Sequence, residues 1–116
     1  MEEFLSRVFA ARDVAHREHL ATDSFAAHQA LGEFYADVVG AADAVAEVYQ
    51  GLFGKIAGYD VRTESVEHIA DYLREEADWI ETERDILSGG SNAVANLIDG
   101  VTAIYLRTVY KLENLQ

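Results

Sequence analysis

The residue types that could carry chemistry gather in one stretch of the chain, between residues 15 and 47. Imidazole and carboxylate side chains occur there together: His16, His19, His28, Asp43 and Glu47. Imidazole nitrogens and carboxylate oxygens suit iron, manganese and zinc, whereas copper(I) prefers sulfur ligands. The stretch therefore indicates a metal site, for which we expect iron, with zinc or manganese as alternatives.

The spacing of these residues restricts how such a site can form. Asp43 and Glu47 are four apart on a predicted helix, so both carboxylates reach the same point on its flank. His28 precedes Asp43 by fifteen residues, which is about 22 Å along a helix. One helix cannot bring the three to one ion, but two copies packed antiparallel about a two-fold axis can.

A second histidine would come from the end of the preceding helix. His16 and His19 both lie there, and the spacing leaves the choice between them open. The alternative interpretation is that the histidines and acids make polar contacts at an interface and hold no metal. Spacing alone favours neither interpretation.

Other kinds of site find little support. The chain has no cysteine, which excludes disulfides, thiolate nucleophiles and thiolate metal sites. It contains no Gly-x-Ser-x-Gly and no Glu-x-x-His motif, and the Gly51–Lys55 segment lacks the spacing of a phosphate loop. His68 follows Glu64 by four residues, and we expect it at an exposed helix start.

Four helices must position the candidate residues. Apolar residues recur at helical spacing over about residues 3–20, 24–53, 63–88 and 91–115. Thr22, Asp23 and Ser24 offer caps for the second helix, Thr63 for the third and Ser91 for the fourth. No proline interrupts these runs. The sequence therefore predicts an all-α four-helix bundle, formed by residues 1–116 as a single domain.

Three residues inside the predicted helices are unusual for their positions. Gly32 and Gly40 each cost roughly 1 kcal/mol against alanine within a helix, so each predicts the close approach of another helix. Arg12 falls on the inner face of the first helix, where a charged group needs a carboxylate partner.

Charge and hydropathy limit the kinds of partner that we expect the protein to bind. The net charge of −12 is unfavourable for binding nucleic acid phosphates and favourable for attracting cations, although a charge of this kind also simply confers solubility. No apolar run is long enough to span a bilayer. The acidic start after Met1 does not fit a signal peptide. We expect a cytoplasmic protein with neither nucleic acid nor membrane partners.

The same residues carry a resemblance to a known family. The spacing of His16 or His19 to His28, the nearby Phe25, the Asp43–Glu47 pair and the following Gly51 resemble the Dps family of mini-ferritins. The resemblance implies a ferritin-like bundle whose two-fold dimers build a homo-oligomer, up to a cage. It also implies iron bound between two subunits, by two histidines of one and the acidic pair of the other, and Fe(II) oxidation by peroxide or oxygen.

The chain departs from the family pattern in several ways. It is short, and Arg17 or Leu20 stands where the family has a tryptophan after the first ligand histidine. Gly32 replaces an acidic ligand expected four residues after His28, although Glu33 is adjacent. A basic tail is missing, so DNA binding is not implied. The chain resembles short Dps-like proteins of phage genomes. The competing hypothesis is a non-enzymatic helical assembly protein that uses the same face as an interface.

Overall fold

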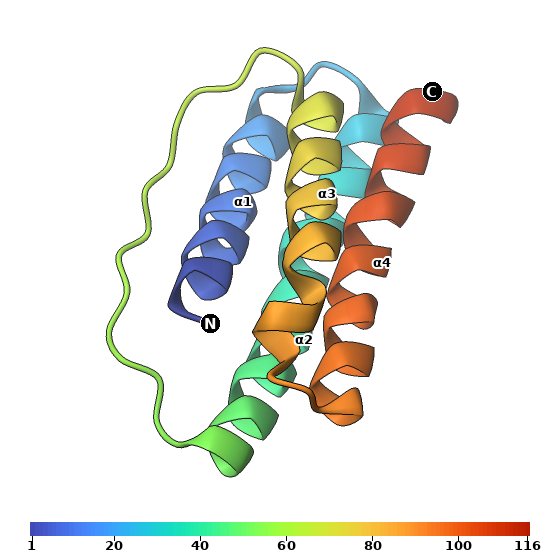
Figure 1. The fold of residues 1–116 in the computed structure, drawn as a ribbon. Coiled ribbons are helices and arrows are strands. Elements are labelled where there is room, and N and C mark those ends of the chain that lie inside the picture. The colour runs from blue at the N-terminus through green and yellow to red at the C-terminus, as the bar shows by residue number, and fades with distance from the viewer.

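The protein is a bundle of four α helices, as the sequence predicts (Figure 1). The structure, a computed structural model, describes all residues from 1 to 116. Its helices are α1 Glu2–Ala21, α2 Phe25–Phe53, α3 Ile69–Ser88 and α4 Asn92–Asn114.

The connections give the bundle a distinctive topology. Tight turns join α1 to α2 and α3 to α4, so each of these pairs is antiparallel (Figure 1). A long connection, residues 54–68, runs the length of the bundle and makes α3 parallel to α2. A four-helix bundle with one long crossover has the connectivity of ferritin-like folds.

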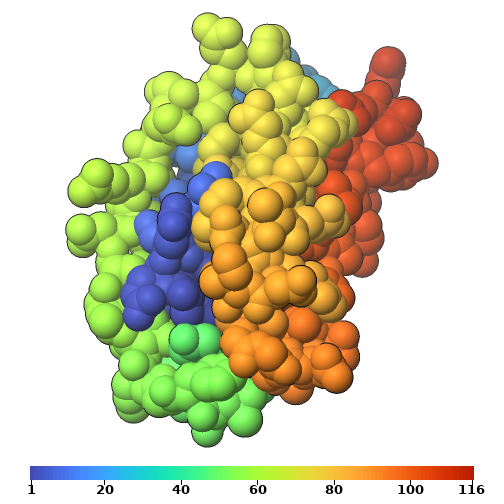
Figure 2. Space-filling model, in the orientation of Figure 1, coloured from blue at the N-terminus to red at the C-terminus, as the bar shows by residue number.

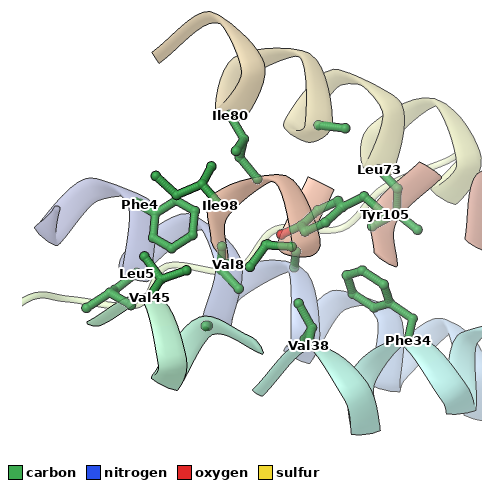
Figure 3. Close-up of a cluster of buried hydrophobic side chains, with 14 of the residues drawn as sticks. Phe4, Leu5, Val8, Phe34, Val38, Val45, Leu73, Ile80, Ile98 and Tyr105 are labelled. Atoms are coloured by element: carbon green, nitrogen blue, oxygen red, sulfur yellow. The ribbon is translucent and has the colours of Figure 1, made fainter. Parts of the chain in front are cut away.

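A single hydrophobic core holds the four helices together. α2 packs against both α1 and α4, α4 also packs against α3, and α1 makes a smaller contact with α3. Side chains from all four helices meet in the centre (Figure 3). Those that are almost completely buried include Phe4, Val8, Phe34, Val38, Val45, Leu73, Ile80, Ile98 and Tyr105. This core fixes α1 and α2 against one another and so positions the histidines.

Local sequence signals set most of the helix ends. Ser24 caps α2 by accepting a hydrogen bond from the Ala27 N–H, and Ser91 caps α4 in the same way through Val94. Gly89 ends α3 in the left-handed conformation, at φ +59°. The two serine caps are confirmed predictions.

The predicted start of α3 was wrong. Thr63 does not cap the helix, which begins at Ile69 with no side-chain cap. The physical reason is reach. A helix from residue 63 would begin about 9 Å further up the bundle and leave only residues 54–62 to cross it, a chain of about 30 Å when fully extended. The bundle measures 44 Å in its longest dimension.

The crossover instead lies extended along the outer side of α1. Figure 2 shows α1 between the crossover and α3. Its backbone is held mainly by α1 side chains, while the Tyr59 ring stacks on Phe9 at 6.2 Å between ring centroids. The side-chain bonds from α1 join Glu2 to the Ala57 N–H, Ser6 to the Asp60 carbonyl and Arg17 to the Glu64 carbonyl. Tertiary contacts therefore override the local helix signals of residues 63–68.

None of the four helices combines the length and the apolar character needed to cross a membrane.

Candidate metal site

The turn between α1 and α2 brings two of the predicted histidines into direct contact. His19 lies in the last turn of α1, and His28 is the fourth residue of α2. Their rings stack with centroids 3.7 Å apart and planes inclined by 18°. The sequence left the choice between His16 and His19 open. The tertiary structure pairs His28 with His19.

Reciprocal hydrogen bonds fix both rings. His19 Nδ1 lies 2.6 Å from the carbonyl oxygen of His28, and His28 Nδ1 lies 2.8 Å from the carbonyl oxygen of His19. A carbonyl oxygen only accepts, so each Nδ1 carries the proton. In the neutral rings each Nε2 then keeps its lone pair. Metal-binding histidines are commonly held this way, through a ring N–H bonded to a carbonyl.

Gly32 makes room for the His19 ring. A Cβ at position 32 would lie 3.0 Å from His19 Cε1, so any larger residue would displace the ring. The Tyr35 ring meets His19 edge-on from the other side, at 5.3 Å between centroids. The close approach predicted at Gly32 is confirmed, although a side chain from the neighbouring helix makes it.

His16 stays outside this pair. Its side chain is exposed and packs against Tyr35, with ring centroids 4.5 Å apart, while its ring centroid lies 6.3 Å from that of His19. His16 therefore borders the pair on the solvent side.

The two predicted carboxylates lie far from the histidines of the same chain. Asp43 and Glu47 are exposed on the outer face of α2, not on the flank of its apolar stripe as predicted. Neither makes an ion pair or a hydrogen bond within the chain, so both are free to bind another group. Within one chain, no three histidine or acidic side chains gather closely enough to hold a metal ion. A complete site with these ligands therefore needs a second chain.

A surface hollow of about 330 Å³ opens beside the histidine pair. Along α2 it extends past Gly32 and Ala36 to Glu33 and Asp37. Lys111 of α4 bonds to Glu33 at 2.5 Å and holds the pKa of that carboxyl below its ordinary value. Asp37 has no such partner, so it is the free carboxylate of the hollow.

The exposed face of α2 continues from this hollow toward Asp43. Its middle is built of small residues at four-residue spacing, Gly32, Ala36 and Gly40. A Cβ at Gly40 would have no atom within 4 Å, so the close approach predicted there does not occur within one chain. An exposed glycine in mid-helix costs roughly 1 kcal/mol against alanine, which nothing in the single chain explains.

A second polar cluster, which the sequence did not predict, lies at the seam between α1 and α3. Arg7 donates to both carboxylate oxygens of Glu76, at 2.8 and 3.1 Å, and its guanidinium covers the Trp79 ring at 4.2 Å. The ion pair raises the pKa of Arg7. The sequence predicted an inward-facing arginine at Arg12. In the structure Arg12 pairs with the adjacent Asp13 at 3.1 Å.

The donor atoms at the α1–α2 turn fit a metal ion in type. The two Nε2 atoms are neutral imidazole donors, and Asp43 and Glu47 of another copy would add anionic oxygens. This nitrogen and oxygen set suits iron, manganese and zinc. The fold and the site together define a four-helix bundle with one long crossover and a paired-histidine surface site.

Comparison with known families places this chain more narrowly. A family model described as a family of unknown function, DUF5856, matches residues 19–112. The chain belongs to this family. The match includes both histidines of the pair and both carboxylates, and it omits His16. No curated protein and no solved structure matches the chain.

Proposed function

We propose that this protein is a homo-oligomeric, Dps-like protein that binds Fe(II) between two subunits and oxidises it with peroxide or oxygen. His28, together with His19 or His16, comes from one subunit. Asp43 and Glu47 come from the other. One observation carries the proposal: His28, whose ring stacks on His19 of α1, and the two carboxylates lie on either side of a small-residue centre on the exposed face of α2.

The positions along α2 favour a two-fold pairing of this face. If two α2 helices cross antiparallel at Ala36, position 28 of one copy lies opposite position 44 of the other, because each is eight residues, or about 12 Å, from the crossing point. Position 44 falls between Asp43 and Glu47. The small residues Gly32, Ala36 and Gly40 then lie at the crossing, where close approach of two backbones needs them.

The direction of the side chains agrees with this pairing. Relative to Ala36 on the outer face, His28 and Asp43 both turn toward the α1 side of α2, as 100° per residue requires. A two-fold axis perpendicular to both helices keeps the α1 sides of the two copies on the same side of the interface. His28 of one copy therefore faces Asp43 of the other, while Glu47 turns slightly to the opposite side of Ala36.

The chemistry of each residue follows from its atoms. The imidazoles offer neutral nitrogens that are held in place by their Nδ1–H bonds. The two carboxylates offer negative charge that stabilises Fe(III) more than Fe(II), because the interaction grows with the charge of the ion. The net charge of −12 raises the local concentration of cations. A cytoplasmic location and an assembly larger than a dimer, up to a cage, belong to the same proposal.

Anaerobic titration with Fe(II), followed by addition of peroxide, tests the proposal. The variants His28→Ala and Glu47→Ala should each lose binding and oxidation. Matched controls are His68→Ala and Glu81→Ala, which remove an exposed histidine and an exposed carboxylate elsewhere. If the first two variants bind and oxidise iron as the wild type does, the proposal is wrong.

Mixing the variants tests whether two subunits share the site. When His28→Ala and Glu47→Ala subunits are mixed in equal amounts and exchanged, half of the dimers are mixed and each mixed dimer has one intact site of two. About a quarter of the wild-type capacity should then return. A site within one subunit would give no recovery.

A non-enzymatic assembly protein is the second candidate, and one observation favours it. The two histidines already satisfy each other's backbone carbonyls, so they have a structural role without any metal. In that case the α2 face would still pair, and the protein would sediment as a dimer that is indifferent to added iron.

A further inference from the structure

We propose that the stacked and hydrogen-bonded His19–His28 pair, called the lock below, is the closed conformation of the metal-free protein. A metal ion bound by both histidines must open it by pulling His28 away. The lock couples metal binding to the end of α1. This inference rests on the proposed metal site and concerns how that site responds to its ion.

The stacked geometry does not allow both rings to bind one ion. An imidazole binds a metal through the lone pair of a nitrogen, which lies in the plane of the ring. The two ring planes are inclined by only 18° and the ring centroids are 3.7 Å apart. Lone pairs in nearly parallel planes do not converge at a bond length of about 2.1 Å. One ring must therefore leave the stack before the two can share an ion.

The surroundings identify the ring that moves. His19 is confined on both sides, because its ring fills the space over Gly32 and meets Tyr35 edge-on. His28 makes its only aromatic contact with His19, and its side chain borders the open hollow. His28 is also the histidine that faces Asp43 of the second copy in the proposed dimer.

Moving His28 removes a cap from α1. The carbonyl of His19 belongs to the last turn, where no N–H four residues on continues the helix, and His28 Nδ1–H is the donor that satisfies it. The neighbouring bond from the Thr22 N–H to the Glu18 carbonyl closes the same turn. Loss of the His28 bond should loosen this turn. Leu20 and Phe25, which are 70% and 74% exposed, flank the turn and would move with it.

Zinc is a suitable probe because it is diamagnetic and takes nitrogen and oxygen ligands. In the wild type, NMR of ¹⁵N-labelled imidazoles should show Nδ1 protons on both His19 and His28 before zinc is added. After zinc is added, His28 should lose its bond to the His19 carbonyl. Hydrogen exchange at the Thr22 amide should accelerate by about five- to tenfold, the effect of losing one ordinary hydrogen bond.

Two variants open the lock without metal. Gly32→Ala forces the His19 ring to shift by a few tenths of an ångström and so disturbs the stack, and His28→Phe keeps a ring that can stack but removes the donor. Both should show fast exchange at Thr22 in the absence of zinc, and zinc should add little further change. Gly100→Ala is the matched control, because this exposed glycine lies on α4, a Cβ there meets no atom, and the lock should stay intact.

The outcomes separate the lock from the metal site. If zinc binds while the His28 bond and the protection of Thr22 persist, the lock is overturned and the metal site stands. If zinc does not bind at all, the proposed site is wrong and the lock falls with it.

Discussion

Two polar clusters hold α1 against its neighbours, and they differ in what they leave free. At the α1–α3 seam, Arg7 and Glu76 use both carboxylate oxygens, and the guanidinium also covers Trp79. At the α1–α2 turn, His19 and His28 use only Nδ1 and keep Nε2 free beside an open hollow. The seam is chemically complete, whereas the turn has unused donor atoms. Polar groups that keep unused donor atoms beside open space, more than polar residues as such, therefore mark a candidate site.

One unsatisfied hydroxyl near the seam is closed to solvent, unlike the open histidine nitrogens at the turn. The hydroxyl of Tyr105 is completely buried and has no hydrogen-bond partner, and burial raises the pKa of this tyrosine well above its ordinary value. Burial raises the pKa of Tyr72 in the same way. Both phenols therefore stay protonated and neutral, which suits a structural region.

The largest expected effect comes from breaking the seam. Arg7→Ala leaves Glu76, which is only 14% exposed, without its counterion. We expect a loss of about 2–3 kcal/mol in the free energy of unfolding, less than for a fully buried pair because Arg7 is 31% exposed. Urea unfolding measures this loss, and iron binding should be unchanged.

The exposed pair Arg84–Asp99 provides the matched control for the seam. Arg84→Ala should cost clearly less than Arg7→Ala in the same measurement, because solvent screens this pair. Equal losses for the two arginine variants would mean that the seam is no more than a surface ion pair.

The next effect comes from the two glycines of α2. Alanine favours helix at both positions, but at Gly32 it also displaces His19. We expect Gly32→Ala to lower the free energy of unfolding by about 1 kcal/mol, and Gly40→Ala to raise that of the single chain by up to about 1 kcal/mol. Chemical unfolding at low protein concentration measures both.

Sedimentation at high concentration then sharpens the comparison between the glycines. If two α2 helices cross near Gly40, Gly40→Ala should weaken the dimer even though it strengthens the helix. An unchanged dimer would argue against close packing at that position.

A smaller effect of the opposite sign is expected at Tyr105. Tyr105→Phe removes a buried hydroxyl that has no partner and keeps the ring, which packs edge-on against Phe34 at 4.9 Å. The variant should be more stable by about 1 kcal/mol, as measured by thermal or urea unfolding. A clear loss of stability would instead show that the hydroxyl has a partner in solution.

The smallest expected effect is on how the stability of the fold depends on pH. Arg84 holds the pKa of Asp99 below its ordinary value, and Lys111 does the same for Glu33. A carboxyl whose pKa is lowered by folding stabilises the protein above its unfolded pKa and loses this contribution as pH falls through the folded value. Stability should therefore decline in the acid range. Asp99→Asn combined with Glu33→Gln should flatten that decline in unfolding measured against pH.

The sequence alone determined the helices and the kinds of atoms available for chemistry. Helical periodicity, the absence of proline and short polar caps such as Ser24 and Ser91 are local properties, so four helices and two tight turns could be predicted from them. The same sequence identified His16, His19, His28, Asp43 and Glu47 as candidate ligands.

Only the tertiary structure decided what depends on the packing of distant segments. The reach needed to cross the bundle delayed α3 to Ile69. The space over Gly32 decided that His19, and not His16, stacks on His28. The seam between Arg7 and Glu76 joins residues 69 apart in sequence, a separation that no local pattern spans. The histidine pair and the carboxylates of one chain lie far apart because a straight helix separates them, and their pairing across two chains stays a prediction.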